Sequence, residues 1–267
     1  NNFARAKKAL GQNFLKSELA LRKIVETGEI KKDDVILEIG PGKGALTSKL
    51  LAFSCQVIAI EKDRELITLL KEKFKKEIEE KRLNLIHGDI LDFDITQIVR
   101  QDLTIYKIIA NIPYNITGAI LKKFLTEKNQ PESMVLMVQH EVAKRIMAQD
   151  KKESMLSLSV KAYGEPKMIM KVPARYFSPR PKVDSAIISI KNISRNKLVN
   201  LAGRQILDEE KFWKIVKTGF AHKRKKLSSN LKNTISCQGE SLTFLGNKRA
   251  ENLTLEDWIL LTKECYN

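Results

Sequence analysis

Residues 35–44 of this chain read VILEIGPGKG, an apolar run of strand length that passes directly into a glycine-rich turn. Glycine has no Cβ, so a turn of this composition can be tight and its backbone can approach a ligand closely. We expect a strand at Val35–Ile39 and a helix that begins near Gly44–Ala45. Such a strand–turn–helix unit presents backbone N–H groups at a helix amino terminus, where a polar or anionic ligand can bind.

The alternation of strands and helices continues to about residue 194. Ser17 is a predicted cap for a helix that ends near Gly28. Strands separated by helical patterns favour parallel βαβ units, so the prediction is an α/β fold with a doubly wound, mostly parallel, Rossmann-like sheet. The further elements expected are strands at Val57–Ile60, Leu83–His87, Tyr106–Ala110 and Met134–Val138, helices at Asp63–Glu80 and Gly118–Leu125, and a closing pair of strands at Lys167–Val172 and Val183–Lys191.

The character of the sequence changes after about Ser194, where short helical patterns follow one another without a convincing strand. Between Lys211 and Lys232 the chain carries many basic residues and no acidic one. We therefore divide the chain into an α/β domain at residues 1–194 and a small all-α C-terminal domain at residues 195–267, which we expect to bind RNA.

The composition describes a globular protein with a large excess of positive charge. The 267 residues include 43% hydrophobic residues, and 48 Lys and Arg face 32 Asp and Glu, a net charge of +16. This excess favours a polyanionic partner, nucleic acid before a membrane surface. No apolar run reaches membrane-spanning length and no signal-peptide pattern is present. Three cysteines without a C-x-x-C pair and three scattered histidines favour a reducing cytoplasm, and neither a disulfide framework nor a metal site is expected.

Polar side chains end three successive predicted strands. Glu61 ends the second strand, Asp89 the third and Asn111 the fourth. Ligands of open α/β sheets bind beyond the carboxyl ends of the strands, so we expect these side chains to meet at one site. Glu61 can accept hydrogen bonds from both hydroxyls of a ribose, and Asp89 can accept one from an adenine amine. Each residue alone could simply be a polar strand end; the three together beside a glycine turn indicate a nucleoside site.

The fourth strand runs into Asn111-Ile112-Pro113-Tyr114. The Asn111 side-chain carbonyl and a neighbouring backbone carbonyl can both accept hydrogen bonds from one exocyclic amine, which makes its nitrogen more nucleophilic. Pro113 restricts the backbone and biases Ile112 towards an extended conformation. Tyr114 offers a flat face for a base. The alternative is an ordinary strand that ends in an Asn-Pro turn.

Four longer motifs occur in order along the chain: LGQNFL at 10–15, NIPYNI at 111–116, FSPRPKVDS at 177–185 and FAHKRKKL at 220–227. Together with the glycine turn, Glu61 and Asp89, they resemble the S-adenosylmethionine-dependent rRNA adenine N6,N6-dimethyltransferases. The resemblance spans nearly the whole chain and implies the class I methyltransferase fold.

The resemblance also implies roles for individual residues. Asn13 and Leu15 would line the methionine end of S-adenosylmethionine, Gly40 and Gly42 would carry the backbone past it, Glu61 would hold the ribose and Asp89 the adenine. Asn111 would touch both cofactor and substrate. The expected catalytic residues are Asn111, Ile112, Pro113, Tyr114 and Phe177. In this arrangement Tyr114 and Phe177 sandwich the adenine ring, although Phe177 could instead be a core residue.

The family resemblance is closest to the KsgA branch, which dimethylates two adjacent adenosines in the hairpin near the 3′ end of small-subunit rRNA. It implies a monomer that acts on an assembling 30S-type subunit, with no membrane or metal partner. Ile112 replaces a common Leu and is also usual in the Erm branch, which methylates an adenine of large-subunit rRNA. The residues expected to contact RNA phosphates are Arg5, Lys7, Lys8, Arg180, Lys182, Lys223, Arg224, Lys225 and Lys226.

Two other classes of function stay open from the sequence. A nicotinamide-dependent oxidoreductase also combines a glycine turn with an acid, but its G-x-G-x-x-G spacing is replaced here by G-x-G-x-G. A non-catalytic RNA-binding assembly factor could use the same fold and the same basic surface.

Overall fold

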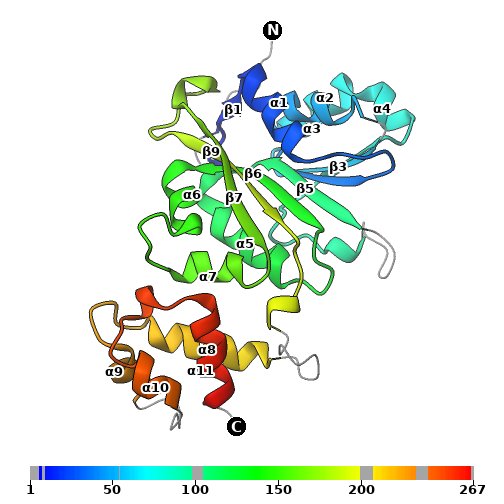
Figure 1. Ribbon diagram of the computed structural model, residues 1–267. Coiled ribbons are helices and arrows are strands. Elements are labelled where there is room, and N and C mark those ends of the chain that lie inside the picture. The colour runs from blue at the N-terminus through cyan, green and yellow to red at the C-terminus, as the bar shows by residue number, and fades with distance from the viewer. Residues whose placement is uncertain are drawn as a thin grey trace. The chain divides into compact units, whose positions relative to one another are not determined.

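The computed structural model describes residues 6–7, 10–53, 55–97, 105–198, 207–232 and 240–265 (Figure 1). The chain forms two compact units. The first consists of Asn1–Ala143 and Glu165–Ile193, and the second of Lys144–Gly164 and Ser194–Asn267.

One mixed sheet forms the centre of the first unit. In the described residues its seven strands have the order β4-β3-β2-β5-β6-β9-β7, and the first five run parallel while β9 is antiparallel to both of its neighbours. This confirms the predicted doubly wound, mostly parallel sheet. The bounds are β2 Val35–Ile39, β3 Gln56–Glu61, β4 Leu83–His87, β5 Tyr106–Asn111, β6 Ser133–Gln139, β7 Glu165–Val172 and β9 Ser185–Lys191.

The strand order reverses between β2 and β5. β2 pairs with β3 on one side and with β5 on the other, so the connections leave the sheet in opposite directions from this point. A crevice forms outside the carboxyl ends of strands where such a reversal occurs. Glu61 and Asn111 are the last residues of β3 and β5, which places both at this crevice.

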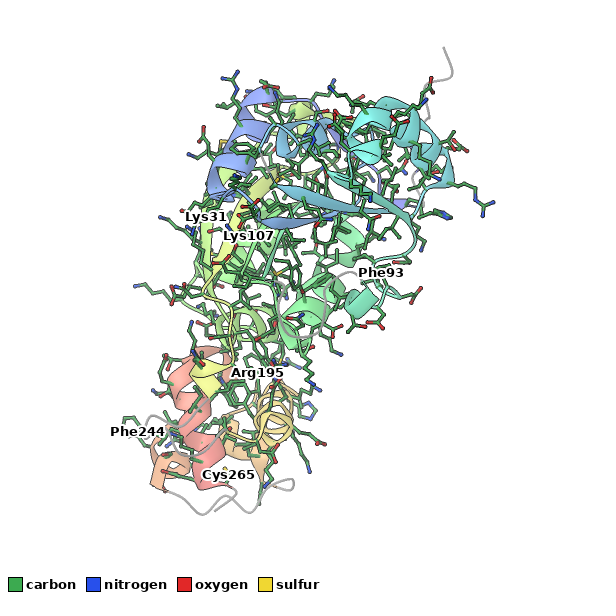
Figure 2. The ribbon with its side chains drawn as sticks, turned by 90° about the vertical axis from the view of Figure 1, so that its right-hand side faces the viewer. Lys31, Phe93, Lys107, Arg195, Phe244 and Cys265 are labelled. Carbon is green, nitrogen blue, oxygen red and sulfur yellow. The ribbon has the colours of Figure 1, made fainter. Side chains whose placement is uncertain are left out.

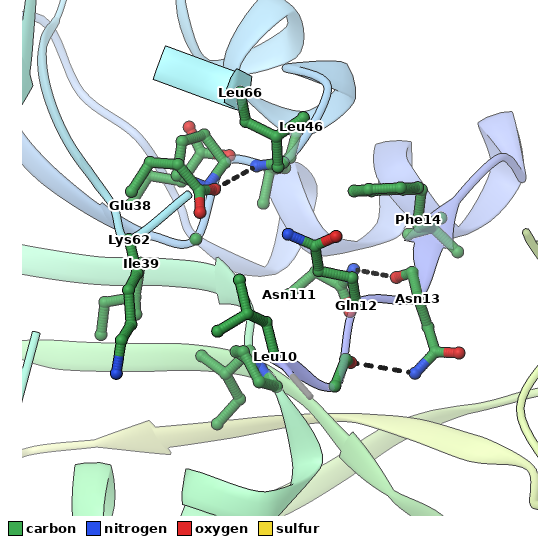
Figure 3. A pocket seen from close by; sticks show the side chains of 18 of the residues that line it. Leu10, Gln12, Asn13, Phe14, Glu38, Ile39, Leu46, Lys62, Leu66 and Asn111 are labelled. Carbon is green, nitrogen blue, oxygen red and sulfur yellow. Dashed lines mark hydrogen bonds between the residues drawn. The ribbon is translucent and has the colours of Figure 1, made fainter. Parts of the chain in front are cut away.

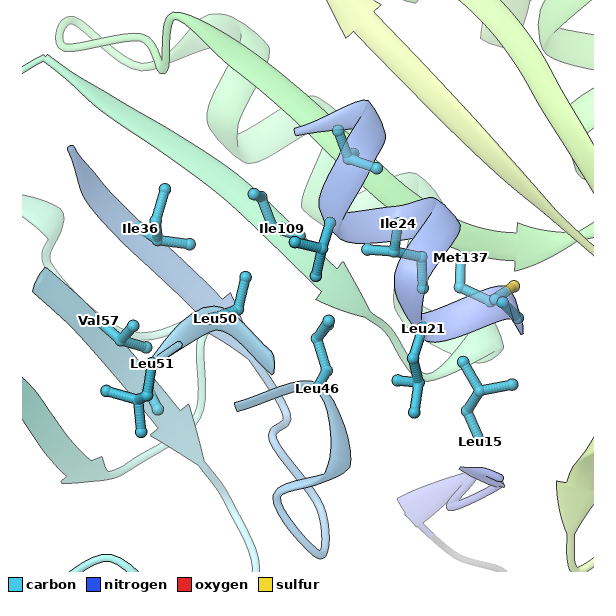
Figure 4. Close-up of a cluster of buried hydrophobic side chains, with 14 of the residues drawn as sticks. Leu15, Leu21, Ile24, Ile36, Leu46, Leu50, Leu51, Val57, Ile109 and Met137 are labelled. Atoms are coloured by element: carbon cyan, nitrogen blue, oxygen red, sulfur yellow. The ribbon is translucent and has the colours of Figure 1, made fainter. Parts of the chain in front are cut away.

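Helices α1 (Glu18–Thr27) and α2 (Ala45–Leu50) cover one face of the sheet, as Figure 4 shows. Ser17 caps α1 as expected, because its Oγ accepts a hydrogen bond from Ala20 N at 3.3 Å. Ile24 of α1 and Leu50 of α2 are fully buried in the same hydrophobic cluster as Ile109 of β5. α5 (Thr117–Thr126) follows β5 close to its predicted position.

The predicted long helix after β3 is interrupted at Phe74. α3 spans Arg64–Lys73 and α4 spans Lys75–Glu79, while Phe74 between them has φ −111° and ψ 29°. The Phe74 ring is 4% exposed and packs behind the glycine turn. Gly44 has φ +75°, and a Cβ at Gly44 would lie 2.5 Å from the Phe74 ring, so only glycine fits there.

A second, two-stranded sheet was not anticipated from the sequence. β1 (Phe14–Leu15) pairs antiparallel with β8 (Phe177–Ser178), with Leu15 opposite Phe177. This pairing joins the amino-terminal segment to the proline-rich segment that precedes β9.

Buried polar contacts also hold the sheet near the amino-terminal end of β5, a central strand. Lys107 of β5 is 6% exposed, and its Nζ donates to Asp34 Oδ2 at 2.7 Å and to Glu29 O at 3.0 Å (Figure 2). A buried ammonium is tolerated because it is both paired and hydrogen-bonded.

The second unit is helical where it is described. Its helices are α7 Met155–Lys161, α8 Glu209–Gly219, α9 Leu227–Leu231, α10 Glu240–Leu245 and α11 Leu255–Glu264, and α6 His140–Met147 runs into it. α8 and α11 pack around the fully buried Trp258.

The structure groups residues 144–164 with the helical unit, whereas the division drawn from the sequence places them in the α/β domain. Tyr163 Oη donates a short hydrogen bond to Glu209 and accepts one from Trp213 Nε1 at 2.9 Å. Glu153 N donates to Glu251 O at 2.7 Å. These bonds tie the segment to the helical unit, and no local pattern in the sequence indicates such partners.

Among the described helices, none combines the length and the apolar character needed to span a bilayer. Cys55 is free and buried, whereas Cys265 is disulfide-bonded. The disulfide at Cys265 departs from the expectation that the cysteines form no disulfide framework.

Candidate active site

A cavity of about 490 Å³ opens at the carboxyl ends of β2, β3 and β5 (Figure 3). This volume lies in the range of roughly 300–1,000 Å³ that is typical of ligand sites. Five stretches of the first unit line it: residues 10–16, 38–43, 60–62, 88–90 and 111–116, with Leu21, Ala45, Leu46 and Leu66 completing the wall. The cavity therefore lies where the strand order reverses.

The cavity brings together nearly all residues that the sequence assigned to cofactor and catalysis. Each assigned cofactor residue lines it, and so do four of the five assigned catalytic residues. These are Asn13, Leu15, Gly40, Gly42, Glu61, Asp89, Asn111, Ile112, Pro113 and Tyr114.

The glycine turn and Glu61 form one hydrogen-bonded wall. Gly40 has φ +65°, and a Cβ there would meet only Pro113 within 4 Å, so the backbone is open to the cavity. Gly42 N donates to Glu61 Oε2 at 3.0 Å, and Asp63 N donates to Glu61 Oε1 at 2.9 Å. Burial raises the pKa of Glu61, against the effect of these bonds. Each carboxylate oxygen keeps capacity to accept a further hydrogen bond.

Glu38 is a cavity residue that reasoning from the sequence did not assign to the site. It is 1% exposed, and its Oε2 has no hydrogen-bond partner among the described residues. Burial raises the pKa of Glu38 to about 8. The only signal in the sequence was an acid inside the apolar run of β2.

Asp89 lines the cavity two residues beyond the end of β4. Its Oδ2 accepts a hydrogen bond from Lys62 Nζ at 2.6 Å and its Oδ1 accepts one from Leu91 N at 3.0 Å. The Lys62 ammonium is the main reason why the pKa of Asp89 lies below its usual range. Asp89 is therefore an ionised acceptor that shares one oxygen with a lysine, a partner the sequence did not indicate.

Asn111 is oriented by the amino-terminal segment. Its Nδ2 donates to the backbone carbonyl of Asn13 at 3.2 Å, and Asn13 Nδ2 donates to Gly11 O at 3.1 Å (Figure 3). With the amide nitrogen turned towards Asn13, the Oδ1 of Asn111 is left as an acceptor. Ile112 has its side chain buried, 2% exposed, so its contribution to chemistry would come from the backbone.

Tyr114 has a fixed ring at the cavity edge. Its hydroxyl lies 2.6 Å from Ser185 Oγ, and Ser185 is fully buried at the start of β9. Burial raises the pKa of Tyr114, so the phenol is neutral at physiological pH. The ring is thus a neutral, anchored aromatic surface.

Phe177 does not lie where the sequence-based hypothesis placed it. It is 2% exposed, belongs to the same hydrophobic cluster as Leu15, and does not line the cavity. The structure therefore supports the alternative, a core residue. Its pairing with β1 holds it there, and a base could stack on it only after rearrangement.

The basic residues assigned to RNA fall into distinct groups. Arg180 and Lys182 are exposed between β8 and β9, and the four residues 223–226 are exposed between α8 and α9. Lys7 instead pairs with Asp63 and Glu65, at 2.8 and 3.0 Å. Arg5 and Lys8 lie outside the described residues. Within those residues, no cluster of His, Cys, Asp or Glu has the arrangement of a metal site.

The arrangement can bind a nucleoside and polarise an amine. Glu61 and Asp89 place carboxylate acceptors at the ends of the neighbouring strands β3 and β4. Two acceptors so placed can bind the ribose hydroxyls and the adenine amine of one nucleoside. Asn111 Oδ1 and the Ile112 carbonyl can accept two hydrogen bonds from one amine beside the Tyr114 ring.

Known proteins resemble the chain over almost its full length. It is 40% identical over 264 residues to "Ribosomal RNA small subunit methyltransferase A" of Dehalococcoides mccartyi, covering 96% of this chain and 87% of that protein. It is 38% identical to the protein of the same name from Fusobacterium nucleatum, covering 96% of each.

Solved structures share the fold. The 23S rRNA methyltransferase ErmE superimposes with a TM-score of 0.75 at 25% identity, covering 96% of this chain and 100% of ErmE. A dimethyladenosine transferase from Plasmodium falciparum gives 0.76 at 26% identity, covering 93% and 95%. The sheet with its glycine turn is thus the class I methyltransferase fold. A profile of ribosomal RNA adenine dimethylases matches residues 3–266, and the chain belongs to that family of S-adenosylmethionine-dependent enzymes.

Proposed function

We propose that the chain transfers methyl groups from S-adenosylmethionine to the N6 amines of two adjacent adenosines in the hairpin near the 3′ end of small-subunit rRNA. The observation that carries the chemistry is the orientation of Asn111, whose amide nitrogen is taken by Asn13 and whose oxygen is left for an amine. The choice of small-subunit rRNA is supported by the names of relatives at 38–40% identity.

The residues present fit the cofactor. Because Gly40 has no Cβ, its backbone is open to the cavity, which suits a ligand that passes close to the glycine turn. Glu38 presents a buried oxygen that has no hydrogen-bond partner among the described residues, which suits the amino group of a methionine moiety. We assign the ribose hydroxyls to Glu61 and the adenine amine to Asp89, and we place the methionine end beside Asn13 and Leu15.

S-adenosylmethionine supplies a methyl group activated by a positively charged sulfur. The chain's residues act on the acceptor: Asn111 Oδ1 and the Ile112 carbonyl draw hydrogen bonds from the adenine amine and raise the electron density on its nitrogen. Pro113 restricts the backbone that carries this carbonyl. Tyr114 stacks on the flipped base, an interaction worth roughly 1–3 kcal/mol, which offsets part of the cost of unstacking it.

RNA contacts are assigned to exposed basic residues in both units. Arg180 and Lys182 are exposed in the loop that leads into β9. That strand begins at Ser185, whose hydroxyl is hydrogen-bonded to Tyr114. The residues 223–226 supply a second phosphate-binding group. Such contacts give affinity without sequence information, so we propose that an assembling 30S-type subunit in the cytoplasm presents the hairpin and that the enzyme acts as a monomer.

The decisive experiment incubates the protein with methyl-labelled S-adenosylmethionine and either small subunits that lack the modification or large-subunit rRNA. Mass spectrometry of the digested RNA should find N6,N6-dimethyladenosine at two neighbouring positions of the small-subunit hairpin. Methylation confined to large-subunit RNA would assign the chain to the Erm type. RNA binding without methylation of either substrate would favour a non-catalytic assembly factor.

A further inference from the structure

One wall of the cavity is a continuous amino-terminal segment, and each of residues 10–16 lines the cavity. The far end of this segment is held by the pairing of β1 with β8 and by Lys16 N, which donates to Tyr176 O at 2.8 Å. Its middle is held where Asn13 O accepts from Asn111. A third group of contacts holds the near end.

Asp63 is the centre of this third group. Its Oδ2 accepts a hydrogen bond from Gln12 Nε2 at 2.9 Å, and its Oδ1 accepts one from Lys7 Nζ at 2.8 Å. Gln12 Oε1 accepts in turn from the backbone N of Lys7 at 2.7 Å. The Asp63 side chain is only 1% exposed. Two separate residues of the amino-terminal region are therefore fastened to one buried carboxylate.

The same aspartate is bonded to the proposed ribose acceptor. Asp63 N donates to Glu61 Oε1 at 2.9 Å, and Asp63 Oδ1 also caps α3 by accepting from Glu65 N at 3.0 Å. Burial alone would raise the pKa of Asp63, but the hydrogen bonds from Lys7 and Gln12 hold it below its usual range. Asp63 is thus an ionised group with fixed position between the segment and Glu61.

We propose that Lys7, Gln12 and Asp63 are positioning residues for S-adenosylmethionine: they fasten the amino-terminal wall of the cavity to the strand end that carries Glu61. The inference rests on the proposed cofactor site. It reassigns Lys7, which the sequence placed among the phosphate contacts, to the cofactor side of the enzyme. Loosening the cluster frees the wall and relaxes the N–H that orients Glu61, so the cofactor binds more weakly while RNA affinity stays the same.

The test measures two affinities in the full-length protein: S-adenosylmethionine by calorimetry, and small-subunit rRNA over a series of salt concentrations. The variants are Lys7→Met and Gln12→Ala, with Lys7→Arg as the conservative rescue. Lys23→Met is the matched control, because the Lys23 side chain is 43% exposed against 40% for Lys7 and also pairs with a glutamate, Glu26, yet its ion pair does not involve Asp63 or residues 10–16.

Gln12→Ala should weaken cofactor binding about tenfold, the effect of losing a hydrogen bond to a charged group. Lys7→Met should weaken it severalfold, since a partly exposed ion pair is screened. Lys7→Arg should restore affinity, and Lys23→Met should change nothing. Raising the salt to about 0.5 M should weaken cofactor binding by the wild type more than by Lys7→Met, because only the wild type has an ion pair to screen.

Two results would contradict the positioning role of Lys7. If Lys7→Met leaves cofactor affinity unchanged, or reduces the salt slope of RNA binding by roughly 0.7–0.9, Lys7 is a phosphate contact and the positioning role is wrong. A wild-type protein that does not bind S-adenosylmethionine at all would overturn the proposed function itself, and this inference with it. A double-mutant cycle of Lys7→Met with Asp63→Asn should show strong coupling, and additive effects would contradict a shared cluster.

Discussion

The side-chain amide of Asn111 and the backbone carbonyl of Asn13 are joined by a hydrogen bond of 3.2 Å. The two residues come from separate parts of the cavity lining, one from the end of β5 and one from the amino-terminal segment. The bond uses one N–H of the amide and turns its nitrogen towards Asn13, so the Oδ1 of Asn111 is the atom left to accept a hydrogen bond.

Replacement of Asn111 by Ala should lower the rate of methyl transfer by about 100-fold or more, the usual effect of removing one group that stabilises charge in a transition state. Asn111→Asp should be similarly impaired, because a carboxylate cannot donate to Asn13 O. Single-turnover methylation of small-subunit RNA measures the rate. Asn84→Ala, at an exposed position of β4, is the control, and equal rates for Asn111→Ala and wild type would reject the assignment.

Glu61→Gln should weaken S-adenosylmethionine binding by about tenfold or more. Both oxygens of Glu61 accept backbone N–H groups, and a glutamine would turn its NH₂ towards one of them and leave a buried donor unpaired. Calorimetric titration measures the affinity.

Acidification should reduce cofactor affinity through the same residue. Burial raises the pKa of Glu61, so the carboxylate is protonated, and loses acceptor capacity, at a higher pH than an exposed glutamate. The loss should therefore begin above the usual glutamate range as the pH falls. The acid limb should be absent from Glu61→Gln; an identical pH profile for the two proteins would assign it to another group.

Glu38 should make the cofactor-free protein less stable as the pH rises. Its pKa is about 8 in the folded chain and 4.5 for the ordinary side chain, so between these values the folded state binds more protons than the unfolded state. The free energy of unfolding should fall across this window, by at most about 1.4 kcal/mol per pH unit from this group. Urea unfolding of wild type and Glu38→Gln should show a flatter pH dependence for the variant; parallel curves would mean that the pKa of Glu38 is the same in the folded and unfolded chains.

Two substitutions separate the ring of Tyr114 from its hydroxyl. Tyr114→Phe removes the bond to Ser185 Oγ but keeps the aromatic face, so methylation should change little. Tyr114→Ala should lose roughly 1–3 kcal/mol of base stacking. Steady-state kinetics with RNA substrate compares the two, and equal losses would show that the hydroxyl, not the ring, matters.

The exposed residues Lys223, Arg224 and Lys225 should contribute to the salt dependence of RNA binding. Their joint replacement by Ala should make the slope of log affinity against log salt shallower by roughly 2–3. A control with the same loss of charge replaces Lys71, Lys75 and Lys76, which are exposed on α3 and α4. If both triple variants have the same slope, only net charge matters and the 223–225 surface is not a contact.

Local patterns were sufficient to predict the sheet and most of the cavity. An apolar run followed by a glycine turn specifies β2 and its loop, and parallel strands necessarily bring their carboxyl ends to one edge. Glu61, Asp89 and Asn111 could therefore be assigned to one site without knowing what surrounds them.

Features that depend on contacts between distant segments could not be predicted in this way. The family resemblance places Phe177 against the substrate, and nothing in the local sequence reveals its pairing with Leu15. Lys7 was placed on RNA because Asp63, its partner, is remote in sequence. The helix is interrupted at Phe74, whose ring packs against Gly44. A helical pattern in the sequence does not show this contact with the glycine turn.

The pairing of β1 with β8 has a consequence for the newly synthesised protein. The amino-terminal segment leaves the ribosome first, but its partner Phe177–Ser178 is translated only after β2 to β7. The nascent chain can thus assemble most of its sheet before this wall of the cavity gains its pairing partner. Competence to bind the methyl donor is therefore acquired late in translation, and fragments that stop short of residue 177 should fail to retain it.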